Sequence, residues 1–167
     1  ELERPVHWRI NAFFGYEIGG FPQNCETSKK MTDGSFLFNA SIKAKTPFDV
    51  FKIVKLYYTQ DDVLLYKVKL LSKVIANANL VKMRKRLAEI ADAVSAKYGG
   101  FLSVAVSNAN CCEAKFIRKV DQCLTMRIVE AVGSDNVRGW RFEMELEDRE
   151  LKENGLKSIR FRGERTE

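Results

Sequence analysis

The chain has 167 residues and a net charge of +6; 46% of its residues are hydrophobic and 30% are charged, which excludes a largely disordered protein. A chain of this length suits a single domain whose core needs neither a metal nor a disulfide in order to fold. Its longest apolar runs fall short of the roughly 20 residues of a membrane-spanning helix, and its positive charge favours acidic partners.

The first half of the chain has the composition and alternation of β-strands. Alternate residues of 36–45 are apolar, which is typical of a strand that is buried on one face only. Similar patterns predict four strands in this half, at 7–16, 36–45, 50–58 and 63–74. Residues 17–34 contain turn-forming glycine, proline and asparagine, so we expect a long loop between the first two strands.

One long helix is predicted at 80–100. Apolar residues recur along it at spacings of three and four and form one stripe, made of Leu80, Met83, Leu87, Ile90, Ala91, Val94 and Tyr98. Asn79 is a suitable N-cap, and Gly99 suits the left-handed position after the last turn. A stripe of this width predicts that the helix packs on one face of a sheet.

Three more strands are predicted after the helix, at 101–107, 123–132 and 137–147, with a short additional one at 115–120. Residues 133–136 form the hairpin turn between the last two long strands. The predicted fold is therefore α+β, with an antiparallel sheet of about seven strands in the order β-β-β-β-α-β-β-β and one central helix on one face. Residues 1–150 form this domain, and 151–167 form a charged tail that is either a short helix or disordered.

The candidate catalytic patterns all have simpler structural explanations. His7 is the single histidine, so catalytic triads have only one badly placed base to draw on. The glycines of 15–20 are not followed by a helix or by a phosphate-loop lysine. Asp61 and Asp62 are explained by a turn, and the three glutamates at 143, 145 and 147 by a solvated strand face. We therefore predict no catalytic residue, no cofactor and no metal site.

Four cysteines leave the redox state of the protein open. Cys25, Cys111, Cys112 and Cys123 allow two disulfides with three connectivities, or four reduced and buried thiols. A bond between the adjacent pair would be strained, whereas Cys123 pairs more easily with either of them. The vicinal pair could also act as a redox switch. The spacing does not fit a zinc site.

The densest positive charge lies at the start of the predicted helix. Lys82, Arg84, Lys85 and Arg86 occupy its first two turns, and Lys67 and Lys69 share one face of a predicted strand. Together these six residues form a candidate surface for a polyanion such as nucleic acid. An ordinary solvated face is the simpler explanation, because aromatic residues are not interleaved with the charges.

Three short motifs occur in a fixed order along the chain: FGYEIGG at 14–20, KYGG at the end of the helix, and ELEDREL at 145–151. This pattern resembles small exported bacterial α+β domains that have no assigned activity, and it covers most of residues 11–151. Gly15 and Gly19 match the first motif; Lys97, Tyr98 and Gly99 match the second. The resemblance implies export from a Gram-negative cell and supplies no catalytic residues. The cysteines and the loop at 17–34 depart from this pattern.

The leading functional hypothesis is an exported, non-catalytic protein-interaction or structural module of the bacterial cell envelope, with a protein partner or a second copy as its ligand. Glu1 in place of an initiator methionine fits a removed signal or a chosen boundary. We expect a periplasmic or secreted protein, or a cytoplasmic one if its cysteines are reduced. The alternatives are the polyanion binder, and a small-molecule carrier or enzyme with a pocket near Tyr66, Tyr98 or Trp140.

Overall fold

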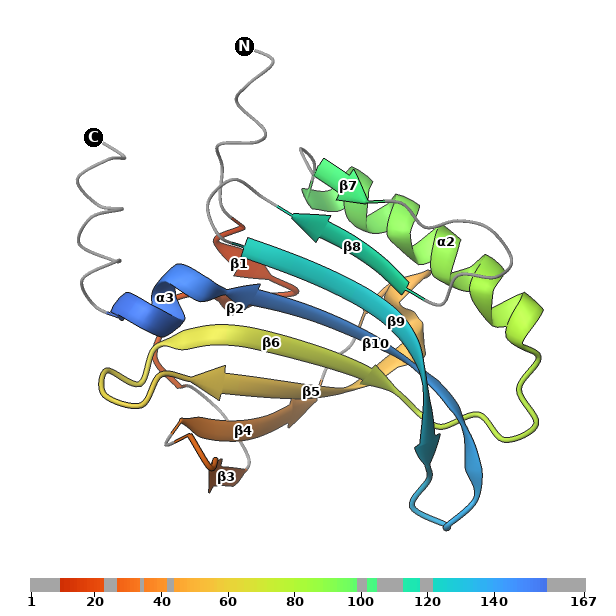
Figure 1. The fold of residues 1–167 in the computed structure, drawn as a ribbon, viewed down its shortest axis with the longest axis horizontal. Coiled ribbons are helices and arrows are strands. Elements are labelled where there is room, and N and C mark those ends of the chain that lie inside the picture. The colour runs from red at the N-terminus through yellow and green to blue at the C-terminus, as the bar shows by residue number, and fades with distance from the viewer. Residues whose placement is uncertain are drawn as a thin grey trace.

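The computed structural model describes residues 10–22, 27–33, 35–41, 44–98, 102–104, 113–117 and 122–155. Over these residues the elements are β1 (Ala12–Phe13), β2 (Tyr16–Glu17), β3 (Thr27–Lys30), β4 (Phe36–Ser41), η1 (Phe48–Val50), β5 (Phe51–Tyr58), β6 (Leu65–Ser72), α2 (Leu80–Tyr98), β7 (Leu102–Val104), β8 (Glu113–Ile117), β9 (Gln122–Val132), β10 (Arg138–Asp148) and α3 (Arg149–Asn154). Eight strands form one sheet in the order β3-β4-β5-β6-β10-β9-β8-β7, and β1 and β2 form a separate hairpin (Figure 1).

The sheet consists of two four-stranded meanders that meet in its centre. β3 to β6 pair in sequence, and β7 to β10 pair in sequence back towards them. α2 carries the chain from the central strand β6 to the far edge at β7, and β10 then pairs with β6. Every one of these strand pairs is antiparallel, which confirms the predicted α+β class with one main helix.

The strand count and order differ from the prediction of seven. Of the single strand predicted at 7–16, residues 7–9 lie outside the described residues. The rest enter the short β1–β2 hairpin, because the turn at Phe14 and Gly15 takes positive φ angles of 50° and 87°. The predicted loop at 17–34 contains β3, an edge strand. The short strand expected at 115–120 is β8, a full member of the sheet.

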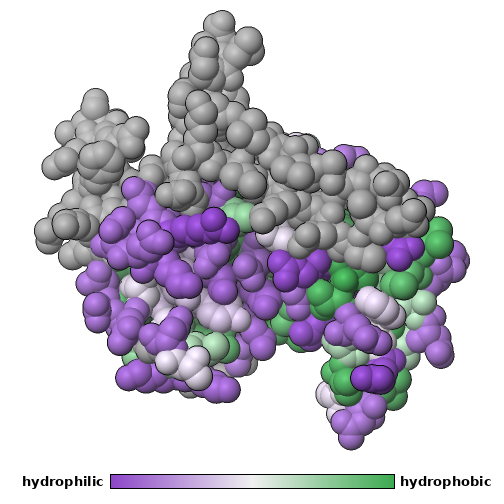
Figure 2. All heavy atoms as spheres, viewed as in Figure 1, coloured by the Kyte–Doolittle hydropathy of each residue, from purple (hydrophilic) through white to green (hydrophobic). Residues whose placement is uncertain are grey.

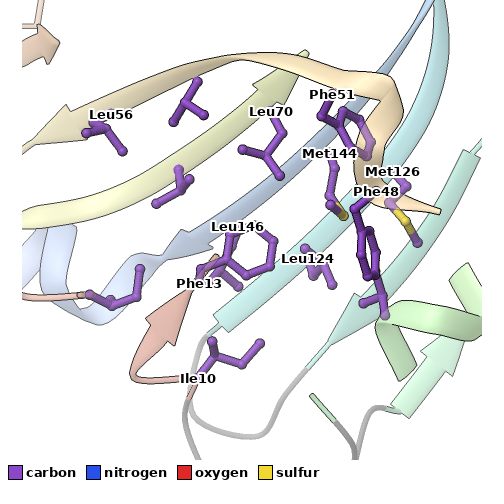
Figure 3. Close-up of a cluster of buried hydrophobic side chains, with 14 of the residues drawn as sticks. Ile10, Phe13, Phe48, Phe51, Leu56, Leu70, Leu124, Met126, Met144 and Leu146 are labelled. Carbon is purple, nitrogen blue, oxygen red and sulfur yellow. The ribbon is translucent and has the colours of Figure 1, made fainter. Parts of the chain in front are cut away.

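One face of the sheet carries the hydrophobic core. Cross-strand register places Val68 opposite Leu146 and Leu146 opposite Leu124, so apolar residues of three neighbouring strands meet in rows. Figure 3 shows Leu124, Met126, Met144 and Leu146 in this cluster together with Phe13 and Phe48. Each large side chain buried in this way contributes roughly 1.5–3 kcal/mol to stability.

α2 covers part of this face and packs against β9. Its buried residues are Met83, Leu87, Ile90 and Val94, which confirms the predicted stripe. Asn79 accepts a hydrogen bond from the Lys82 amide at 3.1 Å, so the predicted N-cap is also confirmed. The helix lies along the β7–β9 half of the sheet rather than over its centre (Figure 1).

The N-terminal segment packs into the same core as the helix. Phe13 is fully buried, and its ring contacts that of Tyr98 at the end of α2, with centroids 5.2 Å apart. The backbone of Gly19 and Gly20 exchanges two hydrogen bonds with Leu65 at the start of β6, with N–O distances of 2.8 and 2.9 Å. These two hydrogen bonds therefore hold the N-terminal segment against the start of β6.

A buried polar network fastens both ends of the described chain to β9. The Gln122 side chain accepts from the Ile10 amide at 2.7 Å and donates to the Ile10 carbonyl at 3.0 Å and to Asp148 at 3.1 Å. Asp148 in turn accepts from the Leu151 amide at 3.0 Å and caps α3. Leu151 is fully buried, so the residue predicted to open the charged tail belongs to a helix packed on the core.

The opposite face, which we call the outer face, is polar and charged. Lys69 lies opposite Glu145 and Lys67 opposite Glu147 on the central strands. Arg141 and Lys152 add ion pairs at 3.6 and 3.8 Å to the glutamates at 143 and 147. Each such ion pair contributes at most about 1 kcal/mol, so the outer face adds little to the stability of the fold.

Candidate binding surface

The basic cluster at the start of α2 does not form one converging surface. Lys82 and Lys85 are exposed, whereas Arg84 is half-buried and has an interaction partner. Arg86 turns towards η1, where its Nη2 lies 3.4 Å from Oδ1 of Asp49. Only the two lysines therefore face solvent openly.

The strand lysines of the same predicted surface lie on the outer face. Lys67 and Lys69 alternate with the core residue Val68, so they point away from the side of the sheet that α2 covers. Lys67 Nζ lies 4.5 Å from the centre of the Tyr57 ring, and burial followed by the charge of Glu145 raises the pKa of the Tyr57 hydroxyl. The structure thus separates the two sets of cations that the sequence predicts to act together.

One of the four cysteines, Cys123, lies among the described residues. Cys123 is buried and its thiol is free, with its Sγ 3.7 Å from Thr125 Oγ1 on the outer face. The other three, Cys25, Cys111 and Cys112, lie outside the described residues.

The space expected to hold a pocket is occupied by core side chains. Tyr98 accepts a hydrogen bond from the Phe14 amide at 2.9 Å, and burial raises the pKa of its hydroxyl. Its ring also packs at a centroid distance of 5.8 Å against Phe14. The Trp140 backbone instead pairs with Ile75, towards one end of the sheet. Tyr66 is buried in the hydrophobic core, and Tyr98 and Trp140 pack against the same core as partly buried residues.

The part of the chain that the structure describes contains neither a metal-binding cluster nor a membrane-spanning helix. Within it, no group of three or more histidine, cysteine, aspartate or glutamate residues is placed to hold a metal ion. Its helices are too short or too polar to cross a membrane.

Exposed apolar side chains gather at one end of the molecule. Ile75, Val81, Val132 and Val137 are 41%, 62%, 54% and 43% exposed, and we call these four side chains the apolar end. They come from the β6–α2 connection, the first turn of α2 and the β9–β10 hairpin. Figure 2 shows hydrophobic residues over this hairpin and at the neighbouring end of α2, on the right of the view.

The core face of the sheet continues to Val132 at the apolar end. Along β9, exposure rises from 4% at Ile128 to 54% at Val132, although alternation keeps both side chains on the same face. On β10, Phe142 is buried and Trp140 is half-buried in the same way. The β9–β10 hairpin projects past the rest of the sheet, beyond the region that α2 covers (Figure 1).

Backbone hydrogen bonds hold the apolar end in a defined shape. Ile75 and Trp140 exchange two of them, with N–O distances of 2.8 and 3.1 Å. Gly139 makes this approach possible, since a Cβ there would clash with the Ile75 carbonyl oxygen. In the hairpin turn the Val137 amide donates to Asp135 at 3.2 Å. The exposed side chains are therefore presented by an ordered backbone.

Cations outnumber anions around the apolar end. The exposed basic residues are Lys73, Lys82, Lys85 and Arg138, and the exposed acidic ones are Glu130 and Asp135. The Asp135 carboxylate is already engaged in the hairpin turn. The surface thus combines aliphatic side chains with a positive rim.

Sequence reasoning missed this surface because its members lie far apart along the chain. One signal was present: Val81 falls outside the apolar stripe of the helix, so its apolar character is not explained by the core. Val132 and Val137 flank the predicted turn at 133–136. The strand pattern places them at strand ends but does not show that their side chains are exposed.

Comparisons with known proteins add no candidate for this surface. No family model, curated protein or solved structure matches the chain.

Proposed function

We infer that this protein is a non-catalytic binding module and that the apolar end is its contact surface. Six large hydrophobic side chains are exposed among the described residues, and four of them form the apolar end. The other two are separate: Phe21 follows the glycines beside the start of β6, and Ile53 lies on the outer face. This concentration is the observation that supports the proposal.

The energetics favour burial against a partner. Fully burying one aliphatic side chain of this size is worth roughly 1.5–3 kcal/mol, and the fold leaves much of that gain unrealised at four neighbouring positions. Because hydrogen bonds already fix the hairpin and the β6–α2 connection, binding there orders little additional backbone. An ordered apolar surface is suited to binding with a small entropic cost.

Site-specific photocrosslinking tests this proposal directly. A benzoylphenylalanine residue replaces Val132 or Val137 in cells that make the protein, and the same residue at Phe21 serves as a matched, exposed apolar control. We expect crosslinked products from 132 and 137 that are absent from 21. Equal labelling at all three positions, or none, would refute a contact surface at the apolar end.

A location in the bacterial cell envelope is part of the same proposal and is supported by the resemblance of the short motifs. Osmotic-shock fractionation of the native cells checks it. The protein should leave with the periplasmic fraction, and retention with a cytosolic marker enzyme would contradict export.

A second candidate is the polyanion binder. It is supported by one observation, the exposure of both Lys82 and Lys85 three residues apart on α2. Retention on heparin at low salt that falls in a Lys82→Gln/Lys85→Gln variant would support it, with a Lys29→Gln/Lys30→Gln variant of the exposed edge strand as control. Passage of the unaltered protein without retention at low salt would exclude this function.

A further inference from the structure

We propose that the apolar end docks on the surface of an anionic lipid membrane. In this mode Val132 and Val137 of the projecting hairpin enter the interface between headgroups and acyl chains, and the surrounding cations contact lipid phosphates. The inference rests on the proposed function, because it names the partner class of the same surface.

The shape of the apolar end suits a planar partner. The β9–β10 hairpin extends beyond the sheet, so Val132 and Val137, on either side of its turn, can reach an interface while the polar turn at 133–136 stays among the headgroups (Figure 1). Its exposed side chains are aliphatic and sit beside the half-buried Trp140, a residue type enriched at membrane–water interfaces. No helix has to cross the membrane for this contact.

The charge pattern favours a lipid surface over a second copy of the chain or a nucleic acid as the partner of the apolar end. A dimer formed through this end would bring together two rims that each carry an excess of positive charge, from Lys73, Lys82, Lys85 and Arg138, and like charges oppose association. Aliphatic side chains gain nothing from nucleic-acid phosphates, whose binders place aromatic residues among the cations. An anionic bilayer satisfies both features at once, since its phosphates attract the rim and its acyl region accepts the valines.

Vesicle sedimentation tests the inference with the full chain. We expect binding to phosphatidylcholine vesicles that contain about 30% phosphatidylglycerol, little binding to pure phosphatidylcholine, and weakening as salt rises above roughly 0.1 M. A Val132→Asp/Val137→Asp variant should bind at least about tenfold more weakly, because charged groups resist transfer to the interface. Lys73→Gln and Arg138→Gln should each lower the partition coefficient about fivefold.

Matched variants keep these results interpretable. Phe21→Asp removes an exposed apolar residue elsewhere, and Lys29→Gln/Lys30→Gln removes two exposed cations from the opposite edge of the sheet. Neither should change the apolar contact, and the edge variant should lower binding less than loss of Lys73 and Arg138. If a valine-to-aspartate variant unfolds, Val132→Ser/Val137→Ser, checked by circular dichroism, tests the same contact with neutral side chains.

Trp140 provides a readout of depth. In a Trp8→Phe variant it is the single tryptophan of the chain, so quenching by brominated lipids reports its own distance from the acyl chains. We expect quenching on anionic vesicles that disappears in the Val132→Asp/Val137→Asp background. Unchanged emission on vesicles that sediment the protein would overturn insertion at the apolar end.

The remaining outcomes distinguish this inference from the proposed function. Absence of vesicle binding together with protein crosslinks from 132 and 137 would overturn the membrane partner and leave the binding module standing. Absence of both would overturn the two together. A dimer that dissociates in Val132→Asp, or heparin retention insensitive to that variant without vesicle binding, would also overturn the membrane partner.

Discussion

At one end of the β9–β10 pair, Gln122 lies opposite Asp148, and these polar side chains are only 1% and 0% exposed. At the other end, Val132 lies opposite Arg138 and is 54% exposed. We call the first the closed end. Two strands of the same length and alternation thus bury polar groups at one end and expose apolar groups at the other.

The two ends differ in the partners that the rest of the chain supplies to them. At the closed end, the backbone of Ile10 and the amide of Leu151 supply hydrogen bonds from within the chain, which makes the burial of Gln122 and Asp148 tolerable. At the apolar end, the exposed valines have no comparable burial within the fold. The closed end is therefore a structural feature, and the apolar end is where a function is to be sought.

The largest loss of stability is expected in the middle of the β9–β10 pair. Met144 is fully buried between Leu70 and Met126, so Met144→Ala should lower the free energy of unfolding by about 2–5 kcal/mol through lost contacts and a cavity. Urea denaturation measures this change. The neighbouring Glu145→Ala on the outer face should cost less than about 1 kcal/mol, and equal effects would contradict the assignment of the two faces.

The closed end should respond next most strongly. Gln122→Ala removes the partner of both Ile10 backbone groups and one donor to Asp148, and we expect a loss of about 2–3 kcal/mol in the free energy of unfolding. Hydrogen exchange at the Ile10 amide should accelerate in the same variant. Gln60→Ala, at an exposed turn, is the control and should leave both quantities unchanged. An unaltered Ile10 exchange rate would show that the network does not hold the N-terminal segment.

The backbone of the apolar end is sensitive at one glycine. Gly139→Ala places a methyl group against the Ile75 carbonyl, so the β6–α2 connection must shift, at a cost of about 1–3 kcal/mol. Gly133→Ala is the matched control, because the closest atom there belongs to the Asp135 side chain, whose rotation gives up only an exposed hydrogen bond from the Val137 amide and moves no backbone. Thermal denaturation of the two variants measures the difference. A Gly133→Ala variant that is as destabilised as Gly139→Ala would refute this close approach.

Local patterns predicted the elements with strong periodicity. The helix was expected at 80–100 and is described from Leu80 to Tyr98, and the last strand was expected at 137–147 and spans Arg138–Asp148. In both elements, apolar residues recur along the whole length at the period of that element, so one face is consistently buried. β3 has no such signal, because TSKK is an edge strand defined by its pairing with β4.

The candidate surface was harder to predict for a related reason. The Lys82–Arg86 cluster is contiguous in sequence and so was visible, but Arg86 pairs with Asp49, which lies 37 residues away. The apolar end depends on how far α2 extends over the sheet, and this is a property of tertiary packing. Alternation shows which side of β9 faces the core, but it does not show where the cover stops.

The smallest effect on stability is expected at Val132, and it tests the comparison most sharply. Val132→Ser removes an aliphatic group that the fold leaves more than half exposed, so the free energy of unfolding should change by less than about 0.5 kcal/mol. Chemical denaturation provides this value, and crosslinking from position 137 in the same variant reports on binding. Loss of the crosslink with unchanged stability would mean that the side chain serves a partner. A loss of stability as large as that of Gln122→Ala would mean that the apolar end, like the closed end, belongs to the interior of the fold.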